Sequence, residues 1–225
     1  MTAVTFPGES EAYRQQREAL LAAETALRDQ REKVAALRRS LPLGPAVETD
    51  YVFREGPADL ADEDPSRFFD TPLSSLFEGE RNSLIVAHVM FSPEAERACP
   101  MCSLFVDGYD AVVKHLAHKA GFVAVAKAEL GKFRRYAGTR GWHNTRLLSS
   151  HDNSFNRDFN VEVDEGQLPA LSVFTKEPDG RIHHRYTTEG SLVFEHHRMM
   201  DLFCPVWHFF ALLPEGRGDW MPGHG

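Results

Sequence analysis

Hydrophobic positions in the first part of the chain follow a spacing that predicts one long helix over residues 10–41. Apolar side chains recur every seven residues, at Leu20, Leu27, Val34 and Leu41. Ser10 is a suitable N-cap, and Pro42 ends the pattern. So narrow a stripe is typical of a coiled-coil seam. It leaves two possibilities open, packing on a second copy in a homodimer or folding back onto the chain's own core.

Beyond a turn-rich stretch, short apolar runs alternate with helical periodicity. Residues 84–91 are almost continuously apolar, which predicts a strand buried on both faces of a sheet. Four elements are expected next in alternation: a helix at about 99–120, a strand at 122–126, a helix at 128–140 and a strand at 146–150.

The last part of the chain predicts a hairpin followed by a helix. The turn signal Glu177-Pro178-Asp179-Gly180 separates apolar runs at 171–176 and 181–187. A final helix is expected from about Gly190, broken at Pro205. This order predicts an α/β fold with a central mixed sheet flanked by helices. The chain then divides into an N-terminal helical extension (1–47), an acidic wrapping segment (48–82) and the main domain (83–225).

The charge of the chain narrows its expected partners. The formal net charge is −8, which argues against general affinity for nucleic acid. Residues 48–80 hold ten Asp or Glu and two Arg, and we interpret them as a solvated linker rather than a surface for a basic partner. No apolar stretch has the length of a membrane span, and no secretory signal opens the sequence. We therefore expect a cytoplasmic protein with no membrane partner.

The motif Cys99-Pro100-Met101-Cys102 comes directly after the predicted buried strand, at the start of a helix. The first turn of a helix has unpaired N–H groups and the positive end of the macrodipole, both of which stabilise a thiolate. Pro100 suits the first helical position. We therefore predict that Cys99 is an exposed nucleophile and that Cys102, one turn deeper, is the resolving thiol. Pro100 and Met101, between them, are candidate substrate contacts.

A metal site is the competing hypothesis for the same cysteines. Zinc requires two further ligands, and the chain has eleven His and a third cysteine, Cys204. No second CxxC and no suitably spaced His pair completes such a set, so we expect neither a metal nor another cofactor. The alternative function is a non-catalytic metal-binding or interaction protein.

The polar loop at 151–167 is a candidate binding segment, because long loops often carry binding residues. Arg157 in this loop and Trp142 before it are candidates for the wall of a substrate groove near Cys99. The alternative is that Asp152 and Asn156 only cap a short helix within the loop, and the sequence favours this structural role.

Several short motifs occur in an order that resembles a known family. They are Tyr13-Arg14, Ala19-Leu20-Leu21, Leu41-Pro42, Asp50-Tyr51-Val52-Phe53, 73–79, 84–91, Cys99-Pro100-Met101-Cys102-Ser103, Gly141-Trp142, Ser149-Ser150, Phe155-Asn156-Arg157-Asp158-Phe159 and Leu171-Ser172-Val173-Phe174. Together they resemble the bacterial thioredoxin-like proteins of domain-of-unknown-function family 899, described as predicted dithiol-disulfide oxidoreductases. The stretch 195–210 departs from the family by its richness in His and aromatic residues.

The resemblance implies a thioredoxin- or peroxiredoxin-like fold with redox-active thiols at Cys99 and Cys102. It also implies a cis Pro169 beside the dithiol, with the backbone of Leu168 free to pair with an extended substrate. The expected partners are a disulfide-containing protein or small molecule and a thiol reductant. Peroxiredoxins have Thr or Ser three residues before the nucleophile, where this chain has Glu96, so a peroxidase is the weaker variant.

Overall fold

The structure, a computed structural model, describes residues 5–223 apart from 78, 80, 165, 189–203 and 217. The chain divides into two compact units, Met1–Pro42 and Leu43–Gly225. The predicted final helix from Gly190 falls largely outside the described residues.

The first unit is the predicted long helix, α1 (Glu11–Ser40). The Ser10 side chain caps it by accepting a hydrogen bond from the Tyr13 backbone N–H, as the sequence predicts. None of its described residues is buried, and Leu20 and Leu27 are 58% and 61% exposed. The three leucines of the seven-residue stripe are therefore exposed, whereas Val34 is half-buried.

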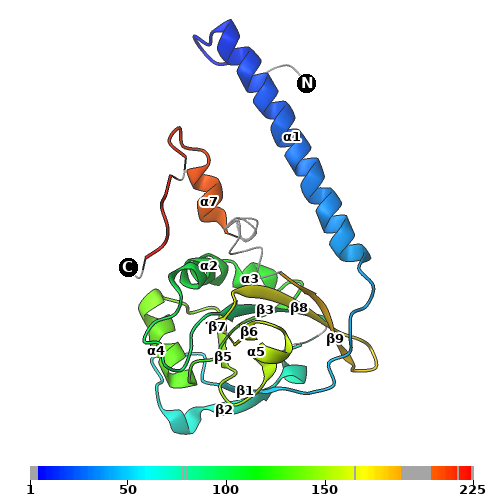
Figure 1. Cartoon of the computed structure of the whole chain (residues 1–225), viewed down its shortest axis with the longest axis vertical. Coiled ribbons are helices and arrows are strands. Elements are labelled where there is room, and N and C mark those ends of the chain that lie inside the picture. The colour runs from blue at the N-terminus through cyan, green and yellow to red at the C-terminus, as the bar shows by residue number, and fades with distance from the viewer. Residues whose placement is uncertain are drawn as a thin grey trace. The chain divides into compact units, whose positions relative to one another are not determined.

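The second unit is built on a seven-stranded mixed sheet with the strand order β2-β1-β5-β4-β3-β8-β9. These strands are β1 (Val52–Glu55), β2 (Phe69–Pro72), β3 (Ser83–Val89), β4 (Gly121–Ala126), β5 (Arg146–Ser149), β8 (Ala170–Lys176) and β9 (Ile182–Thr187). Strands β3, β4 and β5 are parallel, and the β8–β9 hairpin adds antiparallel to β3. The sheet curls, and α2 and α3 lie along its upper side in Figure 1. This arrangement confirms the predicted α/β fold with a central mixed sheet flanked by helices.

The shorter elements connect and cover the sheet. They are η1 (Pro65–Arg67), η2 (Leu73–Leu76), α2 (Pro100–Asp110), α3 (Val113–Leu116), α4 (Leu130–Arg140), α5 (Phe155–Asp158), the β6 (Glu162–Val163) and β7 (Gly166–Gln167) pair, and α7 (Pro205–Phe210). No described helix is both long enough and apolar enough to cross a bilayer.

The core lies on both faces of the central strands, as the apolar runs predict. Alternate residues of β3 and β4 point to opposite faces. Leu84 and Val86 pack with aromatic residues of α5 and β8, whereas Val89 packs with Cys102 of α2 and Phe133 of α4. The start of α2 is therefore fixed against the centre of the sheet.

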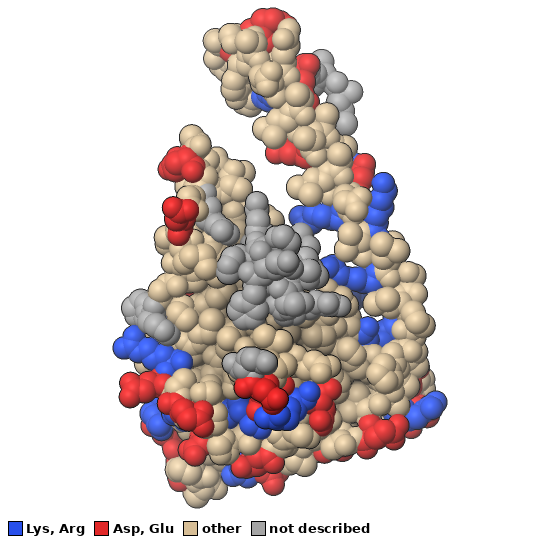
Figure 2. Space-filling model, viewed as in Figure 1, with Lys and Arg blue, Asp and Glu red and all other residues tan. Residues whose placement is uncertain are grey.

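Three local expectations differ from the structure. The single helix expected at 99–120 is two helices, because α2 ends at Asp110 and α3 begins at Val113 after a two-residue turn. The segment 151–167 is not one continuous loop, because it contains α5, the short helix of the alternative interpretation, and the unexpected β6–β7 pair. The acidic segment is part of the domain, because β1 and β2 belong to the sheet. Figure 2 shows acidic and basic side chains interspersed on the visible face of the sheet domain.

Candidate functional site

Cys99 lies at the junction between β3 and α2. It is the N-cap residue of α2, with Pro100 in the first turn. Its backbone N–H donates to the Met90 carbonyl at 2.9 Å, and its own carbonyl accepts from the Ser103 N–H at 2.9 Å. These bonds fix Cys99 at the positive end of the helix, where the sequence predicts it, but Cys99 is half-buried rather than exposed.

Cys102 lies one turn further along α2 and is only 2% exposed. Its sulfur accepts a hydrogen bond from the Met90 backbone N–H at 3.5 Å. A hydrogen bond with the Cys99 side chain, together with burial, raises the pKa of the Cys102 thiol well above its ordinary value. The two cysteine side chains are therefore in contact but differ: Cys99 is partly accessible, whereas Cys102 is buried and protonated.

A cleft of about 600 Å³ opens at Cys99. Its lining comes from the loop before Cys99, the end of β4, α5 and the β6–β7 pair: Met90, Ser92, Pro93, Glu94, Ala95, Arg97, Cys99, Lys127, Arg157, Glu162, Val163, Asp164, Gly166 and Gln167. Arg157, a predicted groove residue, lies on this wall.

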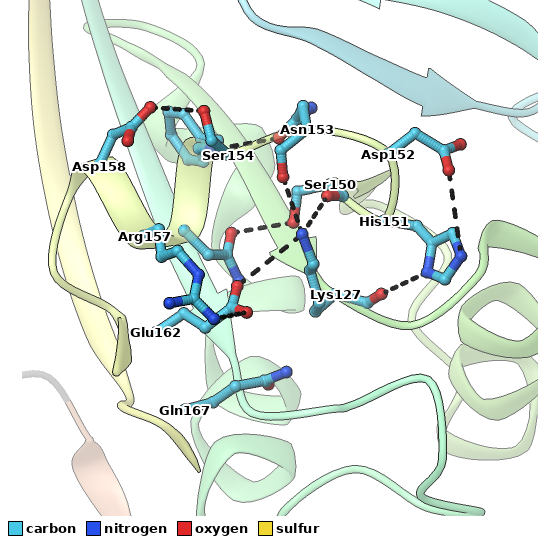
Figure 3. A network of polar contacts seen from close by, with 12 residues as sticks. Lys127, Ser150, His151, Asp152, Asn153, Ser154, Arg157, Asp158, Glu162 and Gln167 are labelled. Carbon is cyan, nitrogen blue, oxygen red and sulfur yellow. Dashed lines mark hydrogen bonds and ion pairs between the residues drawn. The ribbon is translucent and has the colours of Figure 1, made fainter. Parts of the chain in front are cut away.

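The far wall of the cleft is a network of polar contacts (Figure 3). Lys127 Nζ donates to the carbonyls of Asn153 at 2.8 Å and Ser150 at 3.1 Å, and lies 3.8 Å from Glu162 Oε2. Arg157 reaches Glu162 at 3.7 Å and Asp164 at 3.4 Å. The wall carries charges of both signs that already compensate one another.

Gln167 and Lys127 are site residues that sequence analysis missed. The Gln167 side-chain oxygen accepts from the Phe91 backbone N–H at 2.8 Å, which ties β7 to the chain just before the cysteine motif. The available signal for Lys127 was its position as the first charged residue after the apolar run of β4.

Trp142 does not line the cleft. It is 1% exposed, belongs to the same buried cluster as Cys102, and packs edge-on against Tyr136. Its indole N–H donates to Asp107 Oδ1 at 2.7 Å. The structure thus places Trp142 behind the dithiol, as a support for α2.

The remaining predicted residues lie around the site without facing the same cleft. Met101 packs with the cluster of α2 and α7, which contains Cys204 and Trp207, and Pro100 is half-buried at the helix start. Pro169 lines a very small void with Cys102, whereas Leu168 faces a separate cavity beside β9.

The cis peptide bond expected before Pro169 is absent. All peptide bonds among the described residues are trans, in keeping with the general preference of X–Pro bonds. The backbone N–H of Leu168 donates to the Val161 carbonyl at 2.9 Å, so this donor is already used within the chain.

The three cysteines are thiols in this structure. In the part of the chain that the structure describes, no group of three or more His, Cys, Asp or Glu residues could hold a metal ion.

The family comparison covers nearly the whole sequence. A family model described as "Bacterial protein of unknown function (DUF899)" matches residues 3–224. The chain belongs to this family. The match confirms the resemblance carried by the sequence motifs, and the family description assigns no activity.

Solved structures offer more distant similarities. AhpC from Enterococcus faecalis is 13% identical with a TM-score of 0.49, over 69% of this chain and 95% of that one. Peroxidoxin BcpB from Mycobacterium tuberculosis is 15% identical with a TM-score of 0.46, over 67% and 87%. A PrxQ mutant from Xylella fastidiosa is 11% identical with a TM-score of 0.46, over 72% and 97%. No curated protein sequence matches the chain.

Proposed function

We propose that this protein is a dithiol–disulfide oxidoreductase in which Cys99 is the nucleophile and Cys102 the resolving thiol. The Cys99 thiolate attacks one sulfur of a substrate disulfide, which forms a mixed disulfide and releases the other sulfur as a thiol. Cys102 then loses its proton and attacks the Cys99 sulfur, which releases the second substrate thiol and leaves a Cys99–Cys102 disulfide. Two electrons pass from the protein to the substrate, and a thiol reductant returns them.

The observation that carries this proposal is the inequality of the two thiols. Cys99 opens onto a cleft of about 600 Å³, whereas Cys102 is buried and its pKa is raised by the contact with Cys99 and by burial. A hydrogen bond from a protonated Cys102 favours the anionic form of its neighbour. The first attack is thereby assigned to Cys99, and Cys102 keeps its proton until the mixed disulfide has formed.

The cellular setting that we propose follows from the same chemistry. A reducing compartment such as the cytoplasm would return the pair to the dithiol after each turnover. The substrate is a disulfide in a protein or a small molecule. The exposed leucine stripe of α1 would join two copies in a homodimer.

Trapping of the mixed disulfide tests the proposal. The Cys102→Ser variant, incubated with a small disulfide, should accumulate a covalent adduct at Cys99 that mass spectrometry of peptides locates. Wild-type protein should instead accumulate the Cys99–Cys102 disulfide, and Cys204→Ser should behave as wild type, because Cys204 is buried in another cluster. The mechanism fails if the Cys102→Ser variant forms no adduct. It also fails if the Cys99→Ser/Cys102→Ser double variant still forms the adduct.

A further inference from the structure

A basic pocket lies beside the cleft, between the loop before Cys99 and one face of α4. It has a volume of about 520 Å³. Its charged lining consists of four cations and one carboxylate, which are Arg97, Lys132, Arg135, Arg140 and Glu96. These five groups sum to +3, in a chain whose net charge is −8. The pocket is therefore opposite in sign to the protein as a whole.

The cations of α4 are arranged at a cost to the helix. Lys132 and Arg135 are three residues apart and so lie on the same face, and like charges at this spacing destabilise a helix. Local sequence choices that oppose the fold are expected mainly where a site requires them. An anion in the pocket would offset the repulsion.

Two of the four cations are fixed by the protein. Lys132 Nζ donates to the carbonyls of Ala95, at 2.8 Å, and Pro93. Arg140 forms an ion pair with Asp107. These contacts shape the pocket, because they tie the loop before Cys99 to α4 and α4 to α2.

The other two cations remain available for a ligand. Arg97 and Arg135 are exposed, and the guanidinium of neither forms a hydrogen bond or an ion pair within the described part of the chain. A guanidinium group presents a planar fork of donors that matches the paired oxygens of carboxylate and phosphate.

The pocket is connected to the reactive cysteine in two ways. Arg97, two residues before Cys99, lines both the pocket and the cleft. In the pocket lining, the Tyr136 hydroxyl is bonded to Ser103 Oγ at 2.7 Å, and that oxygen donates to the Cys99 carbonyl at 3.0 Å. Because Arg97 lines both cavities, a ligand bound to its guanidinium can extend from the pocket into the cleft at Cys99.

We infer that this pocket binds the carboxylate or phosphate groups of a small disulfide or thiol whose sulfur reaches Cys99, an inference that rests on the proposed function. The two exposed arginines bind the anion directly, while the fixed Lys132 and Arg140 add positive potential. The substrate class is therefore a low-molecular-weight anionic disulfide.

The test compares three disulfides: oxidised glutathione, which carries carboxylates, coenzyme A disulfide, which carries phosphates, and uncharged bis(2-hydroxyethyl) disulfide. The double variant Arg97→Ala/Arg135→Ala should raise KM for one or both anionic disulfides by about tenfold or more. The same variant should lower the rate with the uncharged disulfide far less, so the ratio of the two rates carries the test. Arg181→Ala, which removes an exposed arginine after the β8–β9 turn, should leave all three rates unchanged.

Equilibrium binding separates this inference from the proposed function. Cys99→Ser/Cys102→Ser protein cannot form a mixed disulfide, so calorimetry on it reports binding alone, with and without the two arginine substitutions. Arginine-dependent binding without any turnover by the wild-type protein would support the anion site and refute the proposed function. Turnover of the disulfides without arginine-dependent binding would overturn the inferred anion site. So would an equal loss of rate with charged and uncharged disulfides in the arginine double variant. Failure of both anionic disulfides to bind would overturn it as well.

Discussion

The two cysteines differ most at the scale of single residues. Cys102 is 2% exposed, and its pKa is raised by its hydrogen bond with Cys99 and by burial. Since only the thiolate reacts with alkylating agents, a short iodoacetamide pulse at pH 7.5 should label Cys99 at least about tenfold faster than Cys102. Peptide mass spectrometry measures both rates in one sample. Equal labelling of the two cysteines would contradict the assigned roles.

His88 is a buried titratable group that affects stability rather than the site. Burial, with a smaller effect of His184, lowers the pKa of His88 from 6.5 to about 3. The unfolded chain therefore takes up a proton below pH 6.5 that the folded protein does not. The resulting contribution to stability is present above pH 6.5 and is lost as the pH falls towards 3, by up to about 1.4 kcal/mol per pH unit.

Substitution of His88 by Gln should reduce this acid sensitivity. Between pH 6 and 4.5 the free energy of unfolding of wild type should fall by about 2 kcal/mol more than that of His88→Gln. Denaturant titrations at several pH values measure the slope, which is independent of any constant destabilisation by the substitution. Between pH 7 and 8 the two slopes should agree. If the free energies of unfolding of wild type and His88→Gln change in parallel down to pH 4.5, His88 is not a buried neutral histidine.

At the scale of elements, Arg134 joins α4 to the acidic segment. Although 3% exposed, its guanidinium donates to the carbonyls of Pro57 and Asp59 at 2.7 Å and Asp62 at 3.0 Å. The acidic segment is thus held through its backbone by a buried cation. This contact, like the strands β1 and β2, is not what a solvated linker at 48–80 would form.

Removal of this cation should be costly. Arg134→Met leaves buried carbonyls without donors, so the free energy of unfolding should fall by about 2–4 kcal/mol. The neighbouring Arg135→Met is the matched control, because Arg135 is exposed, and it should change stability by less than about 0.5 kcal/mol. Denaturant unfolding of both variants gives the comparison. Similar losses in the two would contradict the role assigned to Arg134.

Elements with strong local signals could be predicted from the sequence. The apolar runs of β3 and β4, the hairpin turn and the Pro100 helix start are encoded by neighbouring residues. By contrast, α5 depends on distant contacts, such as the hydrogen bond at 2.7 Å between the Tyr51 hydroxyl and Asp158. A short stretch of sequence around α5 contains Asp158 but not Tyr51, so local patterns alone do not predict this contact.

Site residues follow the same distinction. The dithiol could be located, because Cys99 and Cys102 lie within one helical turn. The role of Trp142 depends on Asp107, 35 positions away, which accepts its indole N–H. The cleft combines residues from 90 to 167, and no local pattern predicts which polar side chains of the loop face Cys99.

At the scale of the whole molecule, the chain joins two units of different character. The helical unit has no buried residue among those described and exposes its leucine stripe. The sheet domain contains the buried clusters, the dithiol and both cavities beside it. The proposed chemistry and anion binding therefore belong to the sheet domain, and the proposed self-association belongs to α1.

The most direct test of the account is a redox titration of the full-length protein in buffers of reduced and oxidised dithiothreitol, with peptide mapping at each point. The account predicts a reversible two-electron couple that joins Cys99 to Cys102 and leaves Cys204 a thiol. If both cysteines of the motif stay reduced across the whole range, or if Cys99 pairs with Cys204 instead, the dithiol account is contradicted.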